Sequence, residues 1–502
     1  MHQYDAVIVG SGMGGLACGA ILAKEGYQVC ILEKNKQLGG MLQVFVRDKV
    51  IFDTGVHYVG GLDSGQNLHQ IFTYLGIMDR IRISRMDENC VDGVSFKDDP
   101  RIYQYAQGYE NFVRQMSLHF PKEEKAIRAY CDKMREICRQ FPLYNLESND
   151  YGLNSFAFET DTKAYLESLT SDRKLANVLG GTNFLYAGLP GRTPIFVHAL
   201  IINHYIESAW KFVDGGSQIA IQLAHEILAH GGRIIKHVNV TKFKEHGGEI
   251  AYAEDDQGER YYAKTFISNV HPLKTIQMTE SELFRKAYKQ RLQGLQNTTS
   301  VFYANVVFKE ETFPYNSSNL YAYETDDAWS GQEYTEANWP LAWATFSVQS
   351  RKDGRFAAGM TIMTYMRMDE VEKWRDTFNT VDSESDRGGD YDEFKRKKAE
   401  RLFDVVESRY AGFKASIKSY YTATPLTARD YIGTDDGTLY GFAKDFREPL
   451  RSHVSPKTRI PNLLLTGQNI NLHGVLGVTL SAVATCAHLL GFDYLVKKIK
   501  NG

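Results

Sequence analysis

Hydrophobic and polar positions alternate in distinct blocks along the first part of the chain. Residues 6–9 are all apolar, a glycine-rich segment follows at 10–15, and the next residues to position 24 have the composition of a helix. A second, mainly apolar run covers 28–32 and ends at Glu33. Strand, glycine turn, helix, strand and acidic residue is the order of a dinucleotide-binding unit. The pattern therefore predicts an α/β domain that binds a dinucleotide.

The glycines of segment 10–15 have separate tasks in such a unit. Gly10 permits the tight turn, Gly12 lets the backbone approach a pyrophosphate, and Gly15 lets the helix pack closely on the strand. Free N–H groups at the start of the helix would face the phosphates. Glu33 would accept hydrogen bonds from a ribose 2′-OH and would repel a 2′-phosphate.

A glycine pair just beyond Glu33 favours FAD over NAD. Gly39 and Gly40 can lie against an extended cofactor, whereas a compact NAD domain would continue directly into a helix. The segment FDTGVH at 52–57 adds a further close-approach glycine, Gly55. An ordinary turn at the glycine pair is the alternative interpretation.

Later segments extend the same pattern. Residues 212–218 contain a glycine pair, lead into a predicted helix at 219–229 and then into a predicted strand at 233–235 that continues over 237–240. Val238 is expected to offer backbone contacts to the adenine. A further strand is predicted at 264–269, and residues 463–469 precede the glycine-containing segment HGVLGV at 473–478.

These motifs resemble the flavoprotein family of phytoene desaturases, carotenoid isomerases and retinol saturases, a branch of the wider amine-oxidase-like fold. FDTGVHY at 52–58 and His204-Tyr205 are most similar to the retinol-saturase branch. The resemblance implies non-covalent FAD, with the C-terminal glycine segment lying along the flavin ring. Related amine oxidases carry a basic residue after the glycine pair, whereas Met41 stands here, which argues against amine oxidation.

The positions of the motifs predict two interleaved domains. Residues 1–60, 211–275 and 455–502 are expected to form a Rossmann-type FAD-binding domain. The blocks at 61–210 and 276–454, richer in tyrosine and phenylalanine, are expected to form a substrate domain on a mainly antiparallel sheet with helices. Its predicted strands include 299–308 and 341–347, and its predicted helices include 122–140 and 392–410.

The residues expected to contact the cofactor come from all three pieces of the FAD-binding domain. They are Gly10, Gly12, Met13, Gly14, Gly15, Glu33, Lys34, Gly39, Gly40, Met41, Gly55, Val56, His57, Val238, Asn269, Gly467, Gln468, Gly474, Leu476, Gly477 and Val478. The backbone of the C-terminal loop, or a helix start near Val478, would stabilise negative charge on the reduced flavin.

Hydride exchange with a hydrocarbon needs apolar walls more than a catalytic triad, because the cofactor supplies most of the reactivity. His57, Tyr58, His204 and Tyr205 are the candidate catalytic residues. His57 could donate a proton to a polyene intermediate, or it could simply hold its loop by a backbone hydrogen bond. His198 and His204 are six residues apart, a poor helical repeat for shared ligation, so we expect no metal site.

Three classes of function remain open. The first is an FAD-dependent oxidoreductase that saturates, desaturates or isomerises an apolar polyene or isoprenoid-like lipid. The second is a flavin oxidase of a small amine or other polar molecule, and the third is a non-enzymatic lipid- or prenyl-binding protein on the same fold. Since one complete nucleotide fingerprint occurs, reducing equivalents would come from a partner or from NAD(P)H bound transiently.

Composition and net charge limit the kinds of binding partner that we expect. The 502 residues carry a formal net charge of −3 at pH 7, which gives no reason to expect nucleic acid. We expect a cytoplasmic protein without a signal peptide, and a buried helix rather than a membrane span at 475–492. The basic tail at 494–500 is either a solvated helix end or a contact with a lipid surface. Oligomeric state stays open.

Overall fold

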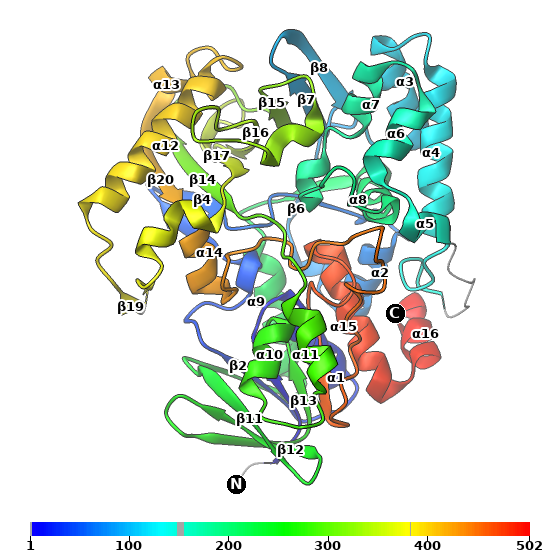
Figure 1. Cartoon of the computed structure of the whole chain (residues 1–502), viewed down its shortest axis with the longest axis vertical. Coiled ribbons are helices and arrows are strands. Elements are labelled where there is room, and N and C mark those ends of the chain that lie inside the picture. Colours follow the sequence, from blue (N-terminus) through cyan, green and yellow to red (C-terminus); the bar gives the residue numbers. More distant parts are fainter. Residues whose placement is uncertain (1–2, 148–154, 382) are drawn as a thin grey trace.

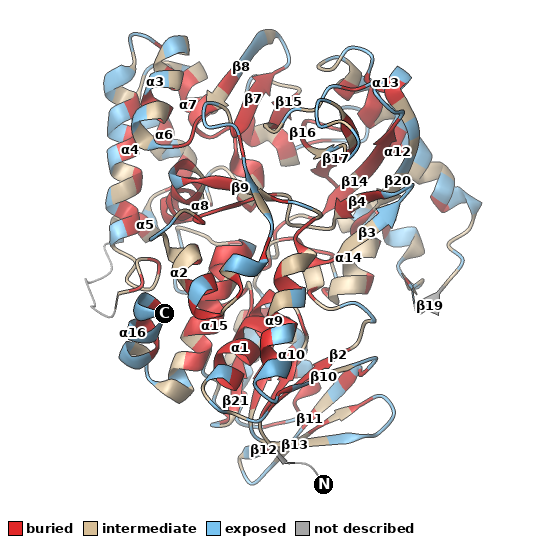
Figure 2. Cartoon of the chain, turned by 180° about the vertical axis from the view of Figure 1, so that it is seen from behind, coloured by how far each residue is buried: buried red, intermediate tan, exposed pale blue. Residues whose placement is uncertain are grey.

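A computed structural model describes residues 3–147, 155–381 and 383–502 of the chain. Figure 1 shows two parts, one built around each large sheet, with the N-terminus at the lower end and the C-terminal helices α15 and α16 packed beside the lower part. Figure 2 shows buried segments in both parts. One cluster of buried apolar residues joins the two parts and includes Leu16 of the lower part and Trp343 of the upper part.

The sheet of the lower part is built from segments far apart in the sequence. Its order is β10 (Arg233–Lys236), β2 (Val29–Glu33), β1 (Gln3–Val9), β13 (Arg260–Ser268), β12 (Glu249–Asp255) and β11 (Val240–His246), with β21 (Leu463–Leu465) beside β13. The strands β10, β2, β1, β13 and β21 are parallel, whereas β11 and β12 form an antiparallel extension. Such a sheet binds ligands at the carboxyl ends of its parallel strands.

Three helices pack at this sheet, with α1 in contact with both of the others. They are α1 (Met13–Lys24), α9 (Ser217–Ala229) and α15 (Gly474–Leu490). Every residue of α1 from Met13 to Ala23 is buried, so α1 is apolar on all sides and is enclosed by its neighbours. The α/β class and the Rossmann-type unit predicted from the sequence are confirmed.

The upper part is organised on a mainly antiparallel sheet. Its order is β20 (Ile417–Ala423), β14 (Val301–Phe308), β17 (Ala357–Tyr365), β16 (Ala342–Gln349), β15 (Asn319–Tyr323), β7 (Asp92–Phe96) and β8 (Asp99–Tyr105). The pairing of β15 with β7 is parallel, and the other pairings are antiparallel. Strand β15 places Asn319 directly opposite Asp92 of β7, a register that matters at the site.

Helices and short sheets complete the fold around these two sheets. The helices are α2 (Asn67–Tyr74), α3 (Tyr109–His119), α4 (Glu124–Arg139), α5 (Ser155–Glu159), α6 (Thr162–Leu169), α7 (Arg173–Leu179), α8 (Ile195–Glu207), α10 (Pro272–Met278), α11 (Lys286–Gln293), α12 (Gly389–Glu407), α13 (Phe413–Ser416), α14 (Pro425–Ile432) and α16 (Phe492–Asn501). The short strands are β3 (Val44–Arg47), β4 (Val50–Asp53), β5 (Val59–Gly60), β6 (Ile83–Arg85), β9 (Ala209–Phe212), β18 (Asn379–Thr380) and β19 (Ser383–Glu384).

Two details of the predicted strands and helices are corrected. The strand at 233–235 does not continue over 237–240, because His237 has a φ of +58° and breaks the strand after Lys236. Val240 instead begins β11, in the antiparallel extension. The helix expected to start near Val478 already begins at Gly474.

The C-terminal helices hold their apolar residues inward. Helix α15 is buried over most of its length, and α16 buries Leu495, Val496 and Ile499. No helix in the described ranges has the length and apolar character that crossing a membrane requires. Contact of the basic tail with a lipid surface stays a prediction, as do the boundaries of the two domains.

The close contact between α1 and β1 gives a first testable prediction. A Cβ added at Gly15 would lie 2.0 Å from the carbonyl oxygen of Gly10. Because the obstacle is backbone, Gly15→Ala should lower the free energy of unfolding by about 1–3 kcal/mol, measured by thermal denaturation. Gly389→Ala is the matched control, since a Cβ there meets open space. Equal melting temperatures of the two variants would contradict this packing.

Candidate active site

One large cavity of about 1290 Å³ lies where the two parts of the fold meet. Its walls come from the carboxyl-end loops of the lower sheet, from α8, and from strands β14, β15, β16 and β17 of the upper sheet. Pockets for a single small molecule measure about 300–1000 Å³. The cavity therefore has room for a dinucleotide together with a second molecule.

The structure brings the predicted site residues together. Every residue predicted to bind the cofactor or to take part in catalysis lines this cavity, with one exception: Gly15 lies behind it, against the Gly10 carbonyl. That position agrees with the packing task expected of Gly15. The roles of the other residues stay predictions, and their geometry shows what each can do.

The glycine loop forms a cradle at the start of α1. Gly10, Gly39 and Gly40 have φ values of +95°, +111° and +56°. Residues that carry a side chain rarely adopt such positive values. A Cβ on Gly40 would lie 3.2 Å from the Cα of Gly12, so the two loops touch through bare backbone. Helix α1 has no side-chain cap at Gly12 and no acidic residue in its first turn. Its first N–H groups are therefore available to an anion.

Glu33 is fixed at the edge of this cradle. Its Oε2 accepts hydrogen bonds from the Ser11 N–H at 2.9 Å and the Ser11 hydroxyl at 2.6 Å, and its Oε1 accepts one from the Asn35 N–H at 2.8 Å. A carboxylate has about four acceptor sites, so Oε1 keeps one for a ribose hydroxyl. Val238, whose N–H donates to the Glu33 carbonyl at 2.9 Å, lines the cavity beside it.

Lys34 and Met41 are two of the predicted cofactor contacts that line the cavity. The Lys34 ammonium donates to the Asp430 carbonyl at 2.9 Å, and burial lowers its pKa. The Met41 Cε would lie 2.5 Å from a Cβ on Gly55. Met41 thus fills apolar space and supplies no charge.

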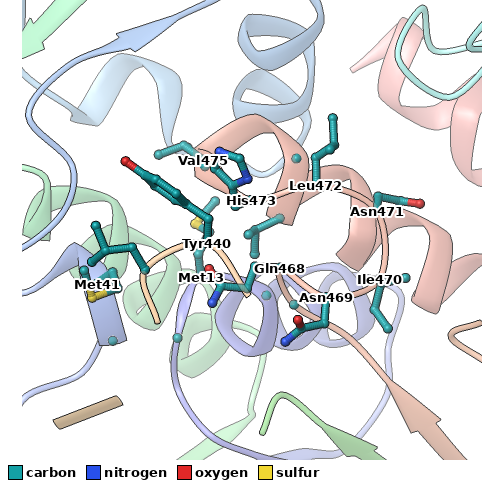
Figure 3. Close-up of a pocket in the computed structure, with 18 of the residues that line it drawn as sticks. Met13, Met41, Tyr440, Gln468, Asn469, Ile470, Asn471, Leu472, His473 and Val475 are labelled. Atoms are coloured by element: carbon teal, nitrogen blue, oxygen red, sulfur yellow. The ribbon is translucent and has the colours of Figure 1, made fainter. Parts of the chain in front are cut away.

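The loop from Gly467 to His473 closes another side of the cavity (Figure 3). Gly467 has a φ of +101°, and a Cβ on it would lie 2.8 Å from Oδ1 of Asn269, at the end of β13. The His473 Nε2 donates to the Leu185 carbonyl at 2.8 Å, and its ring lies 4.3 Å from that of Tyr440. His473 therefore anchors the loop and does not point to solvent.

Two of the candidate catalytic residues are histidines with open nitrogens, a half-buried His57 and a buried His204. The His57 ring stacks on Phe346 with centroids 4.1 Å apart, and its Nε2 has no hydrogen-bond partner among the described residues. Both ring nitrogens of His204 likewise lack partners in the described ranges. Burial lowers the pKa of each ring to about 3. Both rings are therefore neutral at pH 7, and a proton-donating role of His57 stays a prediction.

Tyr58 and Tyr205 pack together, with ring centroids 4.5 Å apart. The Tyr58 hydroxyl lies 2.9 Å from Asp92 Oδ2 and 2.8 Å from the Tyr321 hydroxyl. Tyr321 lines the cavity, whereas Asp92 lies one step behind it. Neither residue was among those predicted from the sequence. An acid at the start of the strand at 92–96 was the available signal, because a buried carboxyl needs partners.

One part of the cavity lining, the aromatic arm, is a cluster of three phenylalanines. Phe141, Phe158 and Phe196 pack together with ring centroids 4.8–5.7 Å apart. Ser155 and Glu159 of α5 line the same cavity and are exposed. The aromatic arm therefore lies next to exposed residues of α5. Among the described residues, no group of His, Cys, Asp or Glu side chains is arranged to hold a metal ion.

The fold combines a dinucleotide-binding sheet with a second, mainly antiparallel sheet, an architecture that it shares with solved amine oxidases. Residues 8–75 match the family model of an NAD(P)-binding Rossmann-like domain. A solved structure of putrescine oxidase bound to putrescine has a TM-score of 0.66, 14% identity, and covers 97% of this chain and 99% of that chain. At this identity the likeness concerns the fold.

Particular relatives appear when the sequence is compared with curated proteins. The chain is 26% identical to the all-trans-retinol 13,14-reductase of Danio rerio, over 100% of this chain and 89% of the relative. It is 24% identical to the chloroplastic prolycopene isomerase 1 of Oncidium hybrid cultivar, over 99% and 85%. The resemblance to retinol saturases and carotenoid isomerases, predicted from the motifs, is confirmed along the whole chain.

The state of His57 can be tested directly. Because burial holds its pKa near 3, the ring should stay neutral from about pH 8 down to about pH 5. We expect one histidine signal in NMR spectra of selectively labelled protein to stay constant over this range and to disappear in His57→Gln. A midpoint near 6.5 for that signal would show that the ring is hydrated and available as an acid.

Proposed function

We propose that this protein is an FAD-dependent oxidoreductase that acts on carbon–carbon double bonds of an apolar polyene or isoprenoid-like lipid. Full-length similarity to proteins named for reduction of retinol and for isomerisation of prolycopene supports the reaction class. The direction, whether saturation, desaturation or isomerisation, depends on the source of electrons. A partner protein or transiently bound NAD(P)H would supply them in a saturation.

One observation carries the proposal. The same cavity joins the glycine cradle at Gly12 and Gly40 to the aromatic arm at Phe141, Phe158 and Phe196. A dinucleotide at the first end and a hydrocarbon in the second would meet near His57, Tyr58, His204 and Tyr205. A small polar substrate would need a compact, enclosed cage, which these walls do not make. The polyene therefore fits better than an amine.

The residues that line the cavity match FAD in their chemical groups as well as in the room that they leave. Bare backbone and the uncapped start of α1 suit a pyrophosphate, and Glu33 suits a ribose hydroxyl. The open nitrogens of His57 and His204 suit a polar ring system. When bound, FAD supplies the hydride exchange with a substrate carbon.

The chain itself positions the substrate and excludes water. Phe346, Tyr303 and Met363 wall the cavity beside His57, so a polyene there would have aromatic and aliphatic neighbours. Neutral histidines in this wall carry no charge that would hold water. Dry walls protect a reactive hydrocarbon from side reactions.

Cofactor binding gives the next prediction. The purified protein should be yellow, and FAD at a hundredfold excess over Kd should stabilise it by about 2.7 kcal/mol. Gly12→Val should abolish flavin binding, because a Cβ there would already lie 2.8 Å from Asn269 Nδ2 and the branched side chain would crowd the backbone expected to face the pyrophosphate. Glu33→Ala should bind more weakly, losing roughly 1.5–3 kcal/mol. Flavin occupancy of Gly12→Val equal to that of the wild type would contradict the cradle.

Substrate class is tested by anaerobic incubation with all-trans-retinol, prolycopene and putrescine, using flavin-loaded protein in its reduced and oxidised forms. We expect a polyene product that has gained or lost two hydrogen atoms, or a changed double-bond geometry, and no change in putrescine. Gly12→Val is the control without flavin. Turnover of putrescine alone would replace the lipid proposal with the amine oxidase.

A further inference from the structure

A buried chain of polar groups leads from the upper sheet to the cavity. Asp92 of β7 and Asn319 of β15 are directly opposite in parallel register, and the Asn319 amide donates to Asp92 Oδ1 at 2.8 Å. Tyr321 stands two residues further along β15, on the same face as Asn319. Tyr58 bridges Asp92 and Tyr321. Asp92 and Tyr321 are 2% and 1% exposed.

The hydrogen bonds fix where a proton on Asp92 would lie. Oδ1 already accepts the Asn319 N–H, so the proton belongs on Oδ2, the oxygen that faces Tyr58. With Asp92 ionised, Tyr58 donates to the carboxylate and Tyr321 donates to Tyr58. With Asp92 protonated, both bonds reverse, since each hydroxyl has a single proton to donate. The Tyr321 O–H is then no longer donated to Tyr58, and Tyr321 is one of the residues that line the cavity.

We propose that Asp92, Tyr58 and Tyr321 form a proton relay, in which Tyr321 is the catalytic acid toward the substrate and Asp92 is the proton reservoir. This assignment rests on the proposed function, because it needs a double bond beside Tyr321. Neutral His57 and His204 leave the acid role open, and Tyr321 lines the cavity beside Phe346, with ring centroids 6.2 Å apart.

The proton transfer balances as follows. The Tyr321 O–H bond breaks as a C–H bond forms at one end of the double bond, Tyr58 passes its proton to Tyr321, and Asp92 passes its proton to Tyr58. The substrate thus gains one proton and Asp92 becomes a carboxylate. In a saturation, FAD bound in its reduced form would supply the hydride that neutralises the positive charge on the adjacent carbon. In an isomerisation this charge is removed by return of the proton to the relay.

The groups around Asp92 suit its role as the store of the transferred proton. Burial raises its pKa to about 6, so a proton is held at mildly acidic pH. Lys211 of β9 is the cation whose charge opposes this shift, and it would stabilise the carboxylate left after transfer. The other titratable groups that face Asp92 are neutral hydroxyls and a thiol, those of Tyr58, Tyr105, Tyr205, Tyr321 and Cys90.

The relay can be tested without substrate. Infrared difference spectra of flavin-loaded wild type against Asp92→Asn should show a protonated carboxyl that ionises near pH 6. Tyr58→Phe should raise this midpoint, because the ionised form loses a hydrogen bond. A midpoint at or below the ordinary value of 3.8, or one that is the same in Tyr58→Phe, would overturn the relay.

Turnover of all-trans-retinol or prolycopene gives the second readout. Tyr321→Phe should slow the reaction by about a hundredfold or more with flavin content unchanged. The wild-type rate should fall as pH rises through about 6, since the relay must be protonated, and Asp92→Asn should lose this dependence. The matched control is Tyr323→Phe, on the same strand and equally buried, whose hydroxyl donates to the Gly181 carbonyl outside the cavity.

The possible results distinguish a failure of the relay from a failure of the proposed function. A Tyr321→Phe rate equal to that of Tyr323→Phe, in an enzyme that converts the polyene, would overturn the catalytic acid and leave the proposed function standing. A wild type that converts neither polyene would contradict the proposed function, and the infrared midpoints would still decide whether the relay exists.

Discussion

Contact between bare backbones at the start of α1 is the constraint on which the rest of the structure depends. Gly15 lets α1 approach the Gly10 carbonyl, and Gly40 meets Gly12 with no side chain between them. These contacts place the uncapped helix start at the cavity. A Cβ on Gly14 would come within 2.6 Å of Asn269, so the end of β13 depends on the same space. The cradle, the sheet and the C-terminal loop are therefore one packed unit.

Desolvation sets the chemistry at the other end of the cavity. The same burial that keeps His57 and His204 neutral raises the pKa of Asp92 to about 6 and raises the pKa values of Tyr58 and Tyr321. Hydroxyls that stay protonated can pass a proton without becoming ions themselves. A water-free hydrocarbon site can thus lie beside a source of protons. The charged groups, Asp92 and Lys211, lie behind the residues that line the cavity.

The sequence allowed much of the lower part to be predicted, because its signals are local. Glycines at Gly10, Gly12 and Gly15 followed by Glu33 define a strand, turn and helix within one short segment. The break at His237 could not be predicted, since it depends on a backbone conformation that a non-glycine residue rarely adopts. Tyr321 and Asp92 were missed for another reason. Their association depends on the parallel register of β15 with β7, between strands more than two hundred residues apart.

A crystal structure of the flavin-loaded protein with a bound polyene tests the central claim most directly. The account predicts the diphosphate over the backbone of residues 10–15 and the hydrocarbon along Phe141, Phe158 and Phe196, with one double bond between the flavin and the Tyr321 hydroxyl. A polyene bound outside this cavity, or a diphosphate away from the start of α1, would contradict the claim that one cavity joins cofactor and lipid.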